Sequence, residues 1–79
     1  MITVYTTGPG CQQCVATKRH LDKLGVPYTE VDLRGEPEIA EALRAAGYTT
    51  APIVDVPGQP RPITGYRPDE LDKIAAALR

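Results

Sequence analysis

The stretch that decides the fold reads ITVYTTGPGCQQC and covers residues 2–14. Its first five residues are rich in β-branched and aromatic side chains, which favour a buried strand. The glycines and proline of residues 8–10 then end that strand in a turn. Two cysteines three positions apart follow, where the next helix is expected to begin. The segment therefore predicts a strand, a turn and a helix, with Cys11 and Cys14 at the junction.

The helix that follows has one inward face, whose members recur at helical spacing: Cys14, Thr17, Leu21 and Leu24. Gly25 and Pro27 end this helix. The alternation of residues 28–33 predicts a second strand. A strand–helix–strand unit requires a right-handed crossover, so we expect these two strands to be parallel.

Prolines followed by acidic residues predict two more helices. One begins at Pro37 and ends at Gly47, and its expected inner face is Ile39, Leu43 and Ala46. The other begins at Pro68 and runs to the C-terminus, with an apolar stripe of Leu71, Ile74, Ala75 and Leu78. Between them, residues 53–56 and 61–64 predict a hairpin whose second strand lies at a sheet edge, where proline is tolerated. The expected fold is α/β with the order βαβαββα, a four-stranded mixed sheet flanked by three helices on both faces.

Composition limits the kinds of function. A chain of 79 residues, 42% apolar and 24% charged, predicts a single ordered domain over residues 1–79. Nine basic and ten acidic residues, without a like-charge block, give no reason to expect nucleic acid or an anionic membrane as partner. Neither a membrane span nor a signal segment is visible. We expect a cytoplasmic monomer whose partners are proteins or small molecules.

The pair Cys11-Gln12-Gln13-Cys14 has a chemical meaning at the start of a helix. Backbone N–H groups there have no partner within the helix, and the helix dipole favours an anion. If this effect contributes about 2 kcal/mol, a thiol pKa of about 8.5 falls to roughly 7. We expect Cys11, the more exposed sulfur, to attack a substrate disulfide, and Cys14 to resolve the mixed disulfide. The product is an oxidised Cys11–Cys14 pair.

Other readings of the two cysteines are possible. As a structural staple the bond would close a loop of about four residues, worth roughly 2 kcal/mol or less, and the cytoplasm would keep it reduced. With a single histidine the chain cannot complete a four-ligand zinc site alone, so we expect no metal. A non-catalytic protein-binding or zinc-bridged module remains as an alternative.

Several residues outside the cysteine pair have open interpretations. Gly10 gives a partner close access to the backbone or simply forms a turn. Pro52 is by its residue type alone an ordinary trans proline. Tyr66 packs or contacts a partner, and Arg67 is a docking cation or a solvated charge. We expect His20 to be a solvated helix residue and not a catalytic base, because it lies about two turns from the sulfurs.

The sequence resembles the glutaredoxin-like branch of the thioredoxin superfamily and, within it, the NrdH-redoxins. The resemblance covers nearly the whole chain and rests on VYT (4–6), CQQC (11–14), ATK (16–18), VD (31–32), GY (47–48), AP (51–52) and GYRP (65–68). It implies a thioredoxin fold with Cys11 as nucleophile, Cys14 as resolving cysteine and Pro52 as a cis proline beside them. It also implies partner contacts at Gly10, Gln12, Gln13, Ala51, Gly65, Tyr66 and Arg67.

The resemblance further implies an electron carrier whose only redox group is the Cys11–Cys14 disulfide, with no bound cofactor. Thioredoxin reductase would supply its electrons, and the large subunit of class Ib ribonucleotide reductase would accept them. The sequence departs from the family where Ile63 and Thr64 replace Trp and Ser, and where Tyr66 replaces Phe. Its 6–10 loop lacks the usual Lys, which disfavours glutathione. A glutathione-dependent glutaredoxin or general protein disulfide reductase is the nearest alternative.

Overall fold

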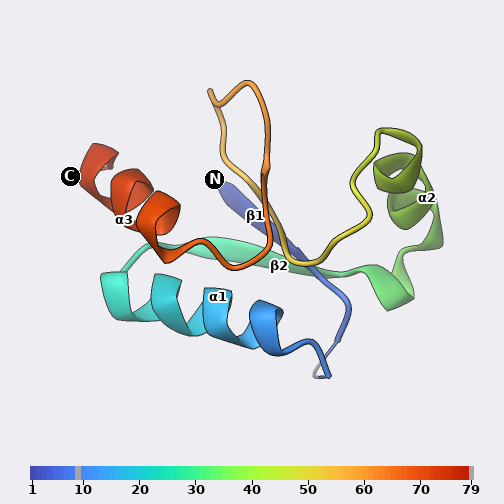
Figure 1. Cartoon of the computed structure of the whole chain (residues 1–79), viewed down its shortest axis with the longest axis horizontal. Coiled ribbons are helices and arrows are strands. Elements are labelled where there is room, and N and C mark those ends of the chain that lie inside the picture. The colour runs from blue at the N-terminus through green and yellow to red at the C-terminus, as the bar shows by residue number, and fades with distance from the viewer. Residues whose placement is uncertain (9, 79) are drawn as a thin grey trace.

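The computed structural model describes residues 1–8 and 10–78. Its elements follow the expected order (Figure 1): β1 (Ile2–Thr6), α1 (Gln12–Leu24), β2 (Tyr28–Asp32), a 3₁₀ turn (Leu33–Gly35), α2 (Pro37–Ala45), β3 (Ile53–Asp55), β4 (Ile63–Thr64) and α3 (Pro68–Ala77). The four strands form one mixed sheet in the order β2-β1-β3-β4. β1 is parallel to β2 and antiparallel to β3, and β3 is antiparallel to β4. The predicted fold class is confirmed.

The main core lies on the sheet face that α1 and α3 cover. The period of two along β1 buries Ile2, Val4 and Thr6 on this face. Val4 pairs with Val54 of β3 in the middle of the sheet, and both are fully buried. Leu21 of α1 and Leu71 of α3 close over the sheet. The cysteine-bearing helix is therefore fixed along its length to the sheet and to α3.

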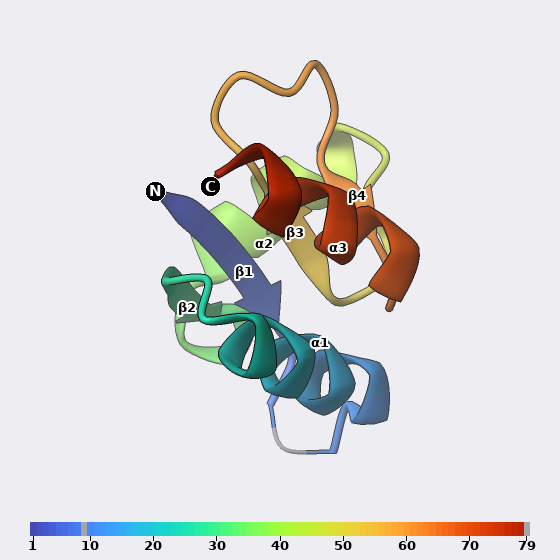
Figure 2. The same ribbon diagram turned by 90° about the vertical axis from the view of Figure 1, so that its left-hand side faces the viewer.

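α2 packs more loosely on the opposite face (Figure 2). The expected inner face is wrong in part: α2 contributes no buried residue, Ile39 and Leu43 are half-buried, and Ala46 is exposed. Leu43 and Ile53 both line a cavity of about 250 Å³ between α2 and the sheet, and Ala46 is the C-cap residue that follows α2. Periodicity correctly predicts the helix but not how closely it approaches the sheet.

The strands are shorter than the sequence pattern suggests. β2 stops at Asp32 because its carboxylate accepts the backbone N–H of Arg34 at 3.0 Å and starts the 3₁₀ turn there. β3 stops at Asp55, before Val56, and β4 comprises only Ile63 and Thr64. The proline-rich segment before β4 forms a long loop that projects from the sheet (Figures 1 and 2). Over residues 1–8 and 10–78, no helix combines the length and apolar character needed to cross a membrane.

Candidate redox-active site

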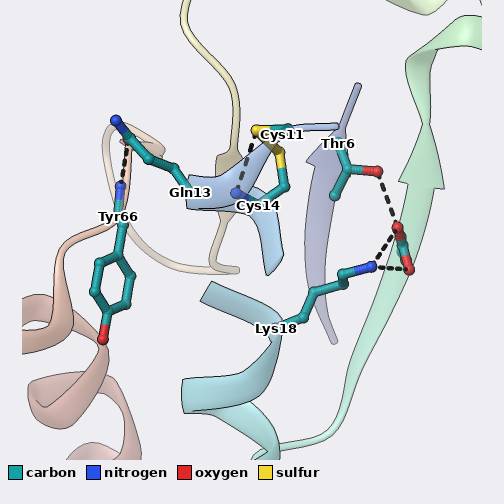
Figure 3. Close-up of a disulfide and its surroundings, with 7 residues drawn as sticks. Thr6, Cys11, Gln13, Cys14, Lys18 and Tyr66 are labelled. Atoms are coloured by element: carbon teal, nitrogen blue, oxygen red, sulfur yellow. Dashed lines mark hydrogen bonds and ion pairs between the residues drawn. A yellow bond between two sulfur atoms is a disulfide. The ribbon is translucent and has the colours of Figure 1, made fainter. Parts of the chain in front are cut away.

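The cysteine pair lies at the start of α1, after the loop that follows β1. Cys11 is the N-cap residue of α1, and its backbone N–H donates to the Gly8 carbonyl at 3.2 Å. The Cys11 Sγ accepts the backbone N–H of Cys14 at 3.2 Å. The two sulfurs form a disulfide, with Cα atoms 5.2 Å apart (Figure 3). A sulfur thus occupies the position where a capping oxygen would satisfy a free N–H group.

The two sulfurs differ in exposure. Cys14 is 1% exposed and faces the core, whereas Cys11 is only half-buried. α1 has no acidic residue in its first turn. No carboxylate within that turn therefore opposes the helix-start amides, which favour a negative charge on Cys11. The accessible sulfur is the one that these amides stabilise.

A second segment of the site contains Pro52. The Ala51–Pro52 peptide bond is cis, the geometry that the family resemblance implied, and Pro52 is buried. The Pro52 carbonyl accepts the backbone N–H of Gly65 at 2.9 Å. This bond joins the loop before β3 to the segment after β4.

A third contact joins that segment to the cysteine motif. The Gln13 Oε1 accepts the backbone N–H of Tyr66 at 3.1 Å (Figure 3). Gly65 has a φ of +77°, and a Cβ there would lie 3.2 Å from the same Gln13 oxygen. A side chain at residue 65 would therefore strain the backbone and crowd this hydrogen bond. The Cys11–Cys14 motif, the cis-proline loop and Gly65–Tyr66 form one connected unit.

The remaining predicted partner residues lie around this unit. Gly10 and Gln12 are exposed in the turn and first helical residue beside the disulfide. Ala51 lines the cavity under α2. Arg67 is the exposed N-cap residue of α3 and lines a different groove, together with Ile63 and Thr64. The structure therefore does not bring Arg67 into the same hollow as Ala51.

His20 is not the solvated residue that its position on α1 suggested. Its side chain is 20% exposed, and its Nε2 lies 2.8 Å from Asp72 Oδ1 on α3. Its ring also meets Tyr66 edge-on, with centroids 6.0 Å apart. The helical pattern of α1 could not reveal this, because the partners come from α3 and the loop before it. His20 links the two helices behind the site.

Two groups of polar contacts near the site are not evident from the sequence, and the first is centred on Glu30. Buried Thr6, at the end of β1, donates its hydroxyl to Glu30 at 2.9 Å, and Lys18 forms an ion pair with Glu30 at 3.1 Å (Figure 3). Thr6 pairs with Asp32 in the β1–β2 register, so β1, β2 and α1 are tied together next to the cysteines. In the sequence, Lys18 belongs to the ATK segment that resembles the family, but that segment does not indicate that Glu30 is its partner.

The second group of contacts is centred on Arg34, which follows β2. Its Nε and Nη2 donate to the Asp32 carboxylate at 2.8–3.2 Å. This hydrogen bonding holds the pKa of Asp32 below its ordinary value. A Cβ on Gly8, whose φ is +102°, would lie 2.5 Å from the Arg34 guanidinium carbon. The guanidinium therefore lies against the loop that hydrogen-bonds Cys11.

A cavity of about 250 Å³ extends from the site toward α2. Apolar and polar side chains from five segments line it: Thr7, Leu33, Arg34, Ala40, Leu43, Arg44, Tyr48, Thr49, Thr50, Ala51 and Ile53. Ala51, the residue before the cis-proline, lies in this lining. In the part of the chain that the structure describes, no group of three or more metal-binding side chains occurs.

The half-exposed sulfur at a helix start pairs with a buried sulfur, and Gly65–Tyr66 joins their motif to a cis-proline. With this fold, the arrangement defines the class as a thiol–disulfide oxidoreductase with a thioredoxin fold. Comparison with known proteins identifies the family. The Glutaredoxin family profile matches residues 2–60, so the chain belongs to the glutaredoxin family.

Within this family the chain is similar to proteins named glutaredoxin-like protein NrdH. It is 38% identical over 76 residues to the one from Escherichia coli, covering 96% of this chain and 90% of that one. It is 31% identical over 75 residues to the one from Lactococcus lactis subsp. cremoris, covering 95% and 100%. The chain is an NrdH-like, glutaredoxin-like redox protein.

Solved structures agree with this assignment. The NrdH-redoxin from Escherichia coli, described as glutaredoxin-like with a thioredoxin-like activity profile, superposes with a TM-score of 0.84 at 37% identity, covering 92% of both chains. A buckwheat glutaredoxin in complex with glutathione gives 0.69 at 25% identity, covering 98% of this chain and 71% of that one.

Proposed function

We propose that this protein is an electron carrier of the NrdH-redoxin kind, reduced by thioredoxin reductase and reducing the large subunit of ribonucleotide reductase. The observation that carries the proposal is the pairing of a helix-start Cys11 with a buried Cys14 in a chain that resembles NrdH proteins over almost its full length. The proposal includes a cytoplasmic, monomeric carrier without a bound cofactor.

The chemistry conserves atoms and electrons in two exchanges. The Cys11 thiolate attacks one sulfur of the acceptor disulfide, forms a mixed disulfide and displaces the other acceptor sulfur as a thiolate. Cys14, as a thiolate, then attacks the Cys11 sulfur and displaces the second acceptor thiolate. Two electrons pass to the acceptor, and the Cys11–Cys14 disulfide remains. The reductase dithiol reverses both exchanges to restore the reduced carrier.

Two features favour a protein reductant over glutathione. The 6–10 loop lacks a lysine that could bind a glutathione carboxylate. The backbone N–H of Tyr66 could otherwise donate a hydrogen bond to a carboxylate of glutathione, but it already donates to Gln13 Oε1. The competing function, a glutathione-dependent glutaredoxin, is favoured by the likeness to the glutathione-bound buckwheat protein and by two arginines along the cavity under α2.

A coupled assay separates these functions. Oxidation of NADPH is followed with a disulfide acceptor, once with thioredoxin reductase and once with glutathione plus glutathione reductase. We expect turnover in the first assay and at most background in the second. Turnover with glutathione alone would replace the proposal by its competitor, and turnover in neither assay would contradict both. Substituting the ribonucleotide reductase large subunit for the model acceptor then tests the acceptor.

A further inference from the structure

Thr17 has a buried hydroxyl that the oxidised protein leaves unused. Only two polar residues among those described are buried, Thr6 and Thr17. Thr6 donates to Glu30, whereas Thr17 is 0% exposed and its Oγ1 has no hydrogen-bond partner within residues 1–8 and 10–78. A buried unpaired hydroxyl costs about 1–3 kcal/mol. Such a cost in a small domain calls for an explanation.

The position of Thr17 on α1 suggests the explanation. A helical threonine commonly donates to a carbonyl one turn back, and Thr17 does not. The residue three positions before it is Cys14, and residues at that spacing lie on one face with Cβ atoms about 5–6 Å apart. Helical side chains lean toward the N-terminus, so Thr17 leans toward the Cys14 turn. Cys14 is 1% exposed, so its sulfur also has little access to water.

We propose that Thr17 is a positioning residue for the redox reaction, whose hydroxyl donates a hydrogen bond to the Cys14 sulfur once the disulfide is reduced. Reduction adds two electrons from an external thiol reductant, breaks the Cys11–Cys14 bond and turns Cys14 into a buried thiol or thiolate. That sulfur is then free to rotate away from Cys11 and can accept a hydrogen bond, which the thiolate form requires. The Thr17 hydroxyl supplies it from inside the same helix.

Thr17 should shift the equilibrium between the oxidised and the reduced protein. The oxidised form carries an unpaired buried hydroxyl, and the reduced form satisfies it. Thr17 therefore favours the reduced form by penalising the oxidised one and stabilising the other. Removing the hydroxyl without changing the volume should shift the equilibrium toward the disulfide.

The test measures the equilibrium between oxidised and reduced protein in a series of glutathione redox buffers at fixed pH, with the oxidised fraction obtained by alkylation and mass spectrometry. In the measured reaction, one protein disulfide and two glutathione thiols react to give two protein thiols and one glutathione disulfide. The equilibrium constant is written for this direction, the reduction of the protein. Thr17→Val is expected to lower this equilibrium constant about tenfold, which is about 30 mV for a two-electron couple. Thr17→Ser, which keeps the hydroxyl, is expected to leave it within about twofold of the wild type.

A second pair guards against a variant that folds poorly. Thr17→Ser and Thr17→Ala also differ by one hydroxyl, and the Ala variant should show the same shift relative to Ser. Unfolding of the oxidised and reduced forms is measured separately for each variant. A residue that only packs in the core would change both stabilities equally and leave the redox equilibrium unmoved. That outcome would overturn the proposal.

The experiment is independent of the identity of the physiological partners. The glutathione buffer serves only to set the potential, and the equilibrium does not depend on which enzyme reduces the protein. A failure of the reductase assay would therefore leave the Thr17 result interpretable, and the reverse also holds.

Discussion

Cys11 combines two roles, because it caps a helix and carries the accessible sulfur. Its Sγ accepts the Cys14 N–H, and its own N–H is held by the Gly8 carbonyl. The helix start therefore provides donors to this sulfur without any movement of the backbone. The single histidine of the chain is engaged with Asp72, so we propose that the helix start, and not a histidine, activates this thiol.

Replacing each cysteine in turn tests the assigned roles. Cys11→Ser should abolish disulfide reduction, because the remaining sulfur is buried. Cys14→Ser should still attack and then accumulate as a mixed disulfide with the acceptor, visible by mass spectrometry under non-reducing conditions. Accumulation in the Cys11→Ser variant instead would show that the roles are reversed.

Gly8 is a second residue whose identity the structure explains. Its φ of +102° disfavours any side chain, and a Cβ would collide with the Arg34 guanidinium. Gly8→Ala should lower the free energy of unfolding by about 1–3 kcal/mol, measured by urea denaturation. Gly10→Ala is the matched control, because a Cβ there meets nothing within 4 Å, and a change below about 0.5 kcal/mol is expected.

Arg34→Ala combined with Gly8→Ala separates collision from backbone strain. If the guanidinium contributes, the double variant should lose less stability than the sum of the two single variants. Strict additivity would mean that the backbone conformation alone makes Gly8 necessary.

The turn after β2 gives a prediction on pH. Hydrogen bonds from Arg34 lower the pKa of Asp32 from its ordinary value of 3.8, so the folded state favours the charged carboxylate. The resulting stabilisation is present above pH 3.8 and is lost as the pH falls through the lower folded value. Asp32→Asn should therefore be less stable than the wild type at neutral pH and approach it in acid. Thermal unfolding from pH 2 to 7 checks this.

The pair is exposed, so the difference should also be small and should shrink when salt is added at neutral pH. A stability gap that grows on acidification would contradict the sign of this linkage.

Comparing the helices shows how far sequence patterns reach. α1 and α3 follow their apolar stripes closely, because both cover the same buried face of the sheet, although Leu78 falls outside α3 and is 62% exposed. α2 has an equally helical pattern but contributes no buried side chain, and its Leu43 lines a cavity between the helix and the sheet. The spacing of apolar residues predicts that a helix has an inner face. It does not predict how deeply that face is buried, because burial depends on residues that are distant in sequence.

The difference between local and long-range contacts also explains which parts of the site could be predicted from the sequence. The cysteine pair, its place at the start of α1 and the difference in exposure follow from local sequence. The contacts of Gln13 with Tyr66, of Pro52 with Gly65 and of Arg34 with Gly8 join residues far apart in the chain. A single sequence carries no signal for such pairs.

The whole molecule rests on a small core with little redundancy. A domain of this size has a total stability of about 4–12 kcal/mol. Leu71→Ala removes a side chain that is 1% exposed and should cost about 2–5 kcal/mol in chemical denaturation, a large part of that total. Leu78→Ala, at the C-cap position after α3, should cost below about 0.5 kcal/mol because Leu78 is 62% exposed. Similar losses in both variants would place the main core elsewhere.

The projecting loop before β4 offers a practical opportunity. Figures 1 and 2 place it on the side of the molecule opposite the start of α1, and residues 57–61 are exposed. Exposed loop tips tolerate inserted sequence. A fluorophore or surface tether attached there would report on, or immobilise, the protein while leaving the sulfur chemistry unobstructed.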